Sequence, residues 1–375
     1  MIIKQNGFLN EFLKAQSNGN LALAAIGNFD PRYNPAIKGS QPLPIFDQIA
    51  NPDLGLTRGG LTNSFIKSLI QTGQPAELAT QYQINGFTSP ITFFTNPYAL
   101  GTDTITNFSN STYNSLQFEA RRRVSAGLNF QGNYTFAKVL TDADGDTQSR
   151  FQPFLDLANT KIERSPAPFD IRHAIKANWI YDLPIGKGHR FSSRRLNLLM
   201  SGWSVSSLFT WQSGSPFSII SGRGTFNRTA RSFYNTADTT LTGSQVDKVV
   251  GFYMTGNGPY FINPSNIGPD GRAVAPDGTA PFSGQVFFNP GPGTIGTLQR
   301  RMFNGPWTFD MDAGVQKLTH ITEKQTVEFR MEAGNVFNHP TFFVGDQNIN
   351  STTFGQIAGT FTDRRVIQFG LYYRF

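Results

Sequence analysis

The sequence contains no cysteine among its 375 residues. This absence excludes a disulfide-stapled scaffold, a thiolate metal site and a cysteine nucleophile. Charged residues are scarce as well, at 15% of the chain, against about a quarter in an ordinary globular protein. No run approaches the roughly 18 consecutive apolar residues of a transmembrane helix, although aromatic residues reach 13%. This composition matches neither an ordinary soluble enzyme nor a helical membrane protein.

The amino terminus lacks the features of an export signal. Lys4 stands alone, and neither an apolar segment nor a cleavage site of small residues follows it. A barrel protein of the cell envelope needs such a signal. The sequence therefore indicates either a chain that is not exported or a piece whose preceding portion is missing.

Signatures of catalysis are missing too. The four histidines are dispersed without metal-ligand spacing: His173, His189, His320 and His339. No H-E-x-x-H or G-x-S-x-G pattern occurs. We therefore expect no enzyme activity, although the sequence leaves open a Ser/His/Asp set at a barrel rim.

The net charge of +7 raises the question of nucleic-acid binding. The basic residues are scattered, however, and the one cluster, Arg121–Arg123, falls at the end of an expected strand. Positive charge at the mouths and lumen of a pore is the simpler explanation of the excess. We expect no nucleic-acid partner.

One acidic segment is the best candidate for a metal site. Asp142, Asp144 and Asp146 alternate beside a glycine and could hold a hard cation such as Ca²⁺. The match to an EF-hand loop is partial, because the sixth position is Thr147 rather than Gly and the twelfth is Pro153 rather than Glu. The alternative is a solvated turn. No other cofactor is expected.

From Tyr113 onward, apolar and polar residues alternate with period two, the pattern of strands with one apolar face. The alternating segments are 113–121, 128–136, 175–181, 203–211, 309–316, 327–333 and 367–375. Aromatic residues stand near the segment ends, where a membrane girdle needs them. The pattern predicts an all-β fold, an antiparallel transmembrane β-barrel segment of about seven or eight long strands that is an incomplete barrel.

The connections between these segments alternate in length. Short links lie around Arg123 and at 318–323, whereas long links occupy 140–170, 213–306 and 338–363. Outer-membrane barrels have short periplasmic turns and long extracellular loops. The long links, with 213–306 the largest, are therefore expected to face the ligand.

Residues 1–112 lack the period of two. Only 8–25 approaches helical spacing, so we expect a short helix there and long extracellular loops elsewhere, over 28–60 and 71–107. Counting back through an odd number of strands from a periplasmic C-terminus also places the first residues in an extracellular loop. An eighth strand within 1–110 would remove this inference.

The polar sides of the segments carry eight charged residues: Glu119, Arg121, Lys176, Asp310, Asp312, Glu328, Arg330 and Glu332. On the lumen side of a barrel they would form ladders across neighbouring strands. Such ladders would contact either a plug or a passing solute, and plug contact is the favoured alternative.

Several motifs resemble those of Oar-like TonB-dependent outer-membrane receptors, which are abundant in Acidobacteria. The first is the hairpin that begins with Tyr113-Asn114-Ser115-Leu116-Gln117. The others follow in order: N-Y-T-F-A-K at 133–138, F-D-I-R-H at 169–173, Y-D-L-P-I-G-K-G at 181–188, Q-S-G-S-P-F at 212–217, N-V-F-N-H-P at 335–340 and R-V-I-Q-F-G-L at 365–371. Each motif is weak alone, but their order over 105–375 is specific.

The resemblance implies a receptor of about 22 strands with a plug inside the barrel and energy supplied through the TonB system. The plug and the TonB box of that family are not found in this sequence. The resemblance also implies that the assembly machinery reads the last strand through Phe369, Leu371, Tyr373 and Phe375. The expected partners are outer-membrane lipid, the barrel-assembly machinery, the plug and the TonB system, all in a Gram-negative outer membrane.

The sequence therefore favours the C-terminal barrel fragment of a TonB-dependent transporter, whose loops capture a large solute. A passive outer-membrane pore is the first alternative. A secreted β-rich adhesin or binding module is the second.

Overall fold

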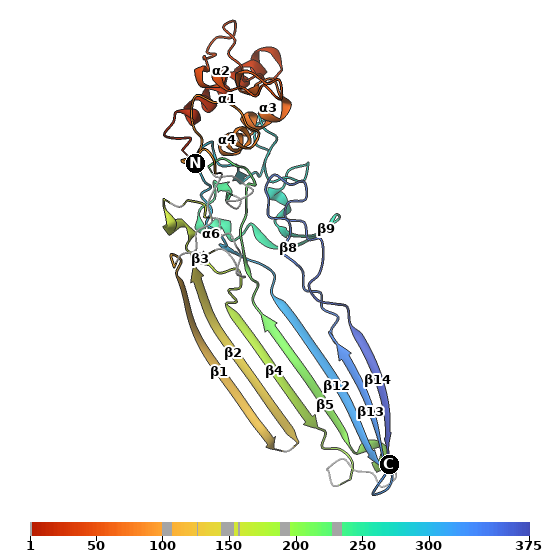
Figure 1. Cartoon of the computed structure of the whole chain (residues 1–375). Coiled ribbons are helices and arrows are strands. Elements are labelled where there is room, and N and C mark those ends of the chain that lie inside the picture. The colour runs from red at the N-terminus through yellow and green to blue at the C-terminus, as the bar shows by residue number, and fades with distance from the viewer. Residues whose placement is uncertain are drawn as a thin grey trace.

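Seven long strands pair in chain order into one antiparallel sheet, which we call the wall (Figure 1). The computed structural model describes residues 2–99, 107–125, 127–143, 154–156, 158–187, 196–226 and 235–375. The long strands are β1 (Ser111–Ser125), β2 (Leu128–Thr141), β4 (His173–Asp182), β5 (Trp203–Gln212), β12 (Thr308–His320), β13 (Thr326–Gly334) and β14 (Val366–Arg374). The short β3 (Ser165–Pro166) adds to β2. The expected antiparallel sheet is confirmed, and it is open, with β1 and β14 as its edges.

The first hairpin departs from the expected bounds. The alternation places its turn around Arg123, but β1 continues until Ser125 pairs with Leu128. Gly127 has φ +80°, and a Cβ there would lie 2.7 Å from the carbonyl oxygen of Asp182. The chain reverses at this glycine because a residue with a side chain fits neither the backbone conformation nor the space.

The strand register sorts the side chains of the wall into two faces, because residues directly opposite one another share a face. One row across five strands joins Glu119, Asn133, Lys176, Thr210 and Asp310. The neighbouring row, on the other face, joins Phe118, Tyr134, Ile175, Trp211 and Phe309. We call these the polar face and the apolar face.

Each face contains a few exceptions. Ile180 and Leu208 lie on the polar face. Arg122, Lys138 and Lys317 lie on the apolar face, each within a few residues of a strand end. Long basic side chains on a lipid-facing surface are tolerated near its borders, where the charged head reaches the interface.

The long connections all leave the same end of the wall and fold together into a loop layer. Its small strands are β6 (Pro216–Phe217) with β11 (Phe303–Asn304), β7 (Asp238–Thr239) with β10 (Phe287–Phe288), and β8 (Val250–Thr255) with β9 (Gly258–Ile262). Short helical turns are η2 (Thr160–Glu163), α6 (Gly243–Val246) and η3 (Pro264–Asn266). Phe287, Ile349 and Phe354 are fully buried in a shared core. The described parts of the connections 213–307 and 335–365 therefore form one packed body.

Two neighbouring arginines attach the third long connection to this layer. Arg300 forms a buried ion pair with Glu163, at 2.6 Å between Nη1 and Oε2. Arg301 donates to Ser165 Oγ at 2.9 Å. Because a buried carboxylate without a partner is costly, this pair fixes η2 against the layer.

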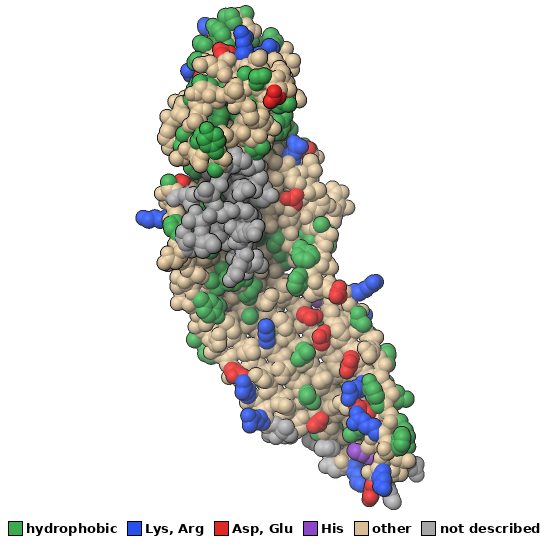
Figure 2. All heavy atoms as spheres, in the orientation of Figure 1, with side chains coloured by type: hydrophobic (Ala, Val, Ile, Leu, Met, Phe, Trp, Pro, Cys, Tyr) green, Lys and Arg blue, Asp and Glu red, His purple; other side chains and the backbone are tan. Residues whose placement is uncertain are grey.

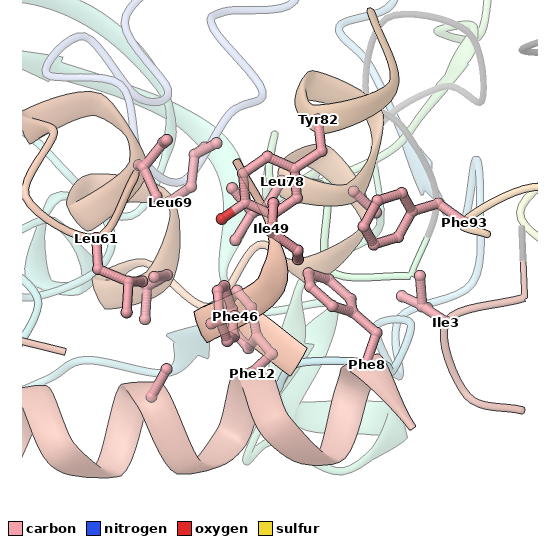
Figure 3. Packing of buried hydrophobic residues seen from close by; sticks show 14 of the residues in the cluster. Ile3, Phe8, Phe12, Phe46, Ile49, Leu61, Leu69, Leu78, Tyr82 and Phe93 are labelled. Atoms are coloured by element: carbon pink, nitrogen blue, oxygen red, sulfur yellow. The ribbon is translucent and has the colours of Figure 1, made fainter. Parts of the chain in front are cut away.

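Residues 2–94 form a helical cap above the loop layer (Figure 1). It contains α1 (Phe8–Ile26), α2 (Pro44–Gln48), η1 (Arg58–Gly60), α3 (Ser64–Gln71) and α4 (Pro75–Ile84). Figure 3 shows Phe8, Phe12, Phe46 and Tyr82 converging on one core. Gly27 ends α1 in the left-handed conformation, and the Asn63 side chain caps α3.

The cap corrects the expectation of long loops over 28–60 and 71–107. The helix expected at 8–25 is present, but 28–60 contains α2, 71–107 contains α4, and α3 lies between them; all three share its core. These helices have five to ten residues, too short for a clear helical period in the sequence. Packing against α1, rather than local propensity, stabilises them.

Among the described residues, no helix has the length and apolar character required to cross a bilayer.

Candidate functional site

All eight charged residues expected on the lumen side lie on the polar face of the wall. Figure 2 shows acidic and basic side chains distributed over the wall. At the β1 edge, Arg121 forms an ion pair with Glu119, and Gln131 Nε2 donates to Glu119 Oε1 at 2.9 Å. Lys176 stands two strands away, opposite Asn133. Whether this face contacts a plug or a solute stays a prediction.

Glu328 organises the other side of the polar face. Its side chain is almost fully buried, and its carboxylate accepts from Arg330 Nε, from Gln316 Nε2 at 2.7 Å and from Arg374 Nη2 at 2.7 Å. These donors come from β13, β12 and β14. One carboxylate therefore joins the last three strands, and Gln316 and Arg374 are the members of the network that the sequence analysis did not single out.

Among the described residues, the other acidic side chains on this side of the polar face form no hydrogen bond with the Glu328 network. Asp312 Oδ1 accepts the backbone N–H of Asn335 at 2.9 Å and fixes the end of β13. Asp310 stands opposite Thr210, and Glu332 stands opposite Gln368. The eight residues thus share a face without forming a single cluster.

A groove of about 930 Å³ runs over the polar face at the β1 edge. Glu119 and Lys176 line it from the wall, and Phe169 and Ile171 line it from the adjoining loop. It combines opposite charges with aromatic surface at the base of the loop layer. Such a groove can hold a polypeptide segment or a mixed polar and apolar solute.

A smaller cleft of about 270 Å³ lies where the cap meets the loop layer. Its polar lining includes Gln74 of the cap and, from the loop layer, Arg223, Arg272, Asp277 and Asn348. The Nε of Arg272 is buried and has no hydrogen-bond partner in the described part of the chain. A buried donor of this kind favours a ligand with an acceptor oxygen.

Arg223 also holds the cap in place beside this cleft. Its guanidinium binds Asp277 in a bidentate pair at 2.7 and 2.8 Å and donates to the carbonyl of Thr72 at 3.0 Å. The carbonyl of Gly224 accepts two backbone N–H groups in the first turn of α4, from Ala76 and Glu77. The cleft residues come from four distant parts of the chain, so no local sequence motif predicts them.

The acidic candidate for Ca²⁺ is only partly within the described residues. Asp142 Oδ1 accepts the N–H of Asn110 at 2.6 Å, which closes the base of the loop. Asp144 and Asp146 lie outside the described residues. Within the described ranges, no three metal-ligating side chains gather. The Ca²⁺ site therefore stays a prediction.

The four residues expected as an assembly signal lie on the edge strand and its end. Phe369, Leu371 and Tyr373 share the apolar face and are largely exposed, as is Phe375. Their exposure leaves them accessible to a partner or to lipid. Recognition by assembly machinery stays a prediction.

Comparison with known proteins identifies the class of this wall. A family model described as an outer membrane beta barrel domain matches residues 48–368. No curated protein and no solved structure gives a significant match. The matched region covers the wall from β1 to β13 and the first residues of β14, the loop layer and the second half of the cap. The chain therefore belongs to the outer membrane β-barrel domain family, whose place is the outer membrane.

Proposed function

We propose that this chain forms the C-terminal part of the barrel of an Oar-like, TonB-dependent outer-membrane transporter and does not act as an enzyme. The observation that supports it most is the open wall, in which all eight charged residues expected in the lumen share one face. Seven strands do not close around a useful channel, so the wall belongs to a larger barrel. In such a barrel the charged face lines the lumen, where it meets a plug.

The loop layer and the cap support the capture of a solute. Long loops of this class are extracellular, so the cap and the cleft beneath it face the medium. The cleft offers guanidinium and amide groups, and the groove below it adjoins the polar face. We propose that a solute meets the cleft first and then passes along the lumen when the plug moves.

The reading frame upstream of codon 1 provides a direct test. The proposal expects continuous coding for further strands, a plug and a TonB box. An in-frame stop next to a separate start with its own export signal would contradict it.

Ion conductance separates the proposal from the passive pore. The full chain is reconstituted in planar phospholipid bilayers, with K⁺ and Cl⁻ as the probes. We expect no uniform conductance steps, because the wall does not close by itself. Uniform steps whose ion selectivity changes in Lys176→Glu would support the pore instead. Lys138→Glu, on the apolar face, is the matched control and should leave the selectivity unchanged.

A further inference from the structure

A short helix, α5 (Asn197–Met200), lies at the short-turn end of the wall, opposite the cap. It belongs to the connection between β4 and β5 and leads directly into Trp203. Trp203 and Lys317 stand directly opposite one another on the apolar face of the wall. The helix is thus next to the border of the surface that faces lipid.

Side chains of the apolar face hold α5 in place. Lys317 Nζ donates to the carbonyls of Leu198 and Ser201 at 2.8 and 3.1 Å. Its ammonium also lies 5.6 Å from the centre of the Trp203 ring. A lysine at the carbonyl end of a helix satisfies groups that have no partner within the helix.

Trp203 and Gly202 complete the attachment. The indole N–H of Trp203 donates to the carbonyl of Leu199 at 2.8 Å. Gly202 has φ +79°, and a Cβ there would lie 2.1 Å from the carbonyl oxygen of Leu318. The glycine allows the backbone to pass close to β12, which fixes the angle at which α5 leaves the wall.

The attached helix presents apolar side chains outward. Leu196, Leu198 and Leu199 are 50%, 64% and 64% exposed. Three exposed leucines on four consecutive positions form a small apolar patch, on a helix that Lys317 and Trp203 attach to the border of the apolar face. Because that face meets lipid in this family, this attachment favours lipid as the occupant of the patch.

The spacing of two tryptophans on β5 agrees with the thickness of the apolar part of the membrane. Trp203 and Trp211 lie on the same face of β5, eight positions apart. At roughly 3.4 Å per residue they are separated by about 27 Å along the strand. A tilt of roughly 40° makes this about 21 Å across the bilayer, close to the apolar band of about 25 Å. The two tryptophans therefore mark its borders.

We propose that α5 is a membrane anchor at the periplasmic border of the barrel. Leu196, Leu198 and Leu199 insert among the phospholipid acyl chains of the inner leaflet, just below the head groups. Trp203 lies at the head-group level, and Lys317 locks the helix in this position by binding its carbonyl end. This proposal depends only on the chain belonging to the outer-membrane β-barrel family. It does not depend on the proposed transport mechanism.

The absence of cysteine makes the anchor measurable by site-directed spin labelling. The full chain carries a nitroxide at Leu199→Cys in vesicles of phosphatidylethanolamine and phosphatidylglycerol. Collisions with oxygen and with a water-soluble nickel complex report its depth. Phe369→Cys, on the apolar face, is the lipid reference, and its contact with lipid shows that the chain in a sample is inserted in the membrane. Glu323→Cys, in the exposed β12–β13 turn, is the aqueous reference.

We expect the label at 199 to resemble the lipid reference, with an oxygen-to-nickel collision ratio several-fold above that of position 323. A ratio equal to that of 323 would place α5 in water and overturn the anchor. Protection from both reagents would also overturn it, because protein rather than lipid would then cover the patch.

Lys317→Ala tests the lock separately. Removing the ammonium should make the label at 199 more mobile and more accessible to nickel. Lys138→Ala, which removes a lysine from the same face at the opposite end, should leave the label unchanged. Equal spectra for the two variants would contradict the role of Lys317.

Discussion

The cap and the wall use the same aromatic residues in opposite ways. In the cap, Phe8, Phe12, Phe46 and Tyr82 are completely buried. In the wall, Phe369 is 65% exposed although it belongs to a regular strand. The difference follows from the surroundings. The cap must remove its apolar surface from water by packing it inward, whereas lipid accepts the apolar face of the wall directly.

The charged side chains of the two regions also differ in where they lie. Charged residues of the cap are mostly at its surface, as in the exposed pair of Arg32 with Asp30. The wall carries most of its charges on the polar face, and Glu328 is almost completely buried there. A soluble unit and a membrane-facing unit thus occur in one chain, and each obeys the rules of its own solvent.

The largest expected effect comes from truncating a buried ring in the cap. Phe46→Ala removes a ring packed against Phe8 and Tyr82 and leaves a cavity. We expect a loss of about 3–5 kcal/mol in the free energy of unfolding of the cap. Faster hydrogen exchange in peptides from α1 and α4 would measure it.

Phe369→Ala is the matched truncation in the wall. It removes the same ring from a surface that faces lipid, so no internal cavity forms and hydrogen exchange of β13 should change little. Equal losses in the two variants would break the contrast between the regions. A stable cap in Phe46→Ala would show that the shared core does not hold it together.

An intermediate effect is expected at Glu328. Glu328→Gln removes the charge that binds Arg330 and Arg374, and it leaves a weaker acceptor for Gln316. Because both arginines are substantially exposed, we expect a loss of about 1–3 kcal/mol rather than the full cost of a broken buried pair. In gel electrophoresis of samples heated beforehand, the temperature at which the band changes its mobility should fall.

Glu332→Gln provides the control on the same strand and face. Glu332 stands opposite Gly314 and Gln368 and accepts no hydrogen bond from the Glu328 network, although its charge acts on Arg330. Its substitution should shift the heating profile much less than Glu328→Gln does. If both variants shift the profile equally, general charge on the polar face, rather than the Glu328 network, stabilises the last strands.

The wall could be predicted from the sequence because each strand has its own signal. A period of two is visible within a single segment, so β4, β5 and β14 were expected at nearly their observed bounds. The shared face of the eight charged residues followed from the same period. The first turn was misplaced, since Gly127 acts through a close approach to Asp182 that the sequence does not display. The link expected at 318–323 lies at 321–325, because β12 continues to His320.

The cap and the cleft could not be predicted in the same way. The helices α2, α3 and α4 are short, and their stability depends on contacts with α1. The cleft joins Gln74, Arg223, Arg272 and Asn348, which are far apart in the sequence. Both features depend on tertiary packing, and no alternation or motif within one segment records it.

The smallest expected effect is a dependence of cap stability on pH. Burial raises the pKa of Glu11, although its Oε1 accepts the N–H of Phe46 at 2.7 Å. The folded cap therefore holds this proton more tightly than the unfolded chain does. The resulting stabilisation is fully present below the ordinary pKa of 4.5 and is lost as the pH rises through the raised value. Glu11→Gln keeps the acceptor and should remove this slope.

Hydrogen exchange of the α2 peptide, corrected for the intrinsic effect of pH, measures the slope above pH 4.5. Asp30→Asn is the control. The hydrogen bond from Arg32 lowers the pKa of Asp30, so its contribution is lost only as the pH falls below the ordinary value of 3.8. Its substitution should leave the slope above pH 4.5 intact. If Glu11→Gln retained the wild-type slope, the Glu11 carboxylate would not be the group that senses pH. The burial of polar groups in the cap, in contrast to the lipid-facing wall, would then have to be tested at another residue.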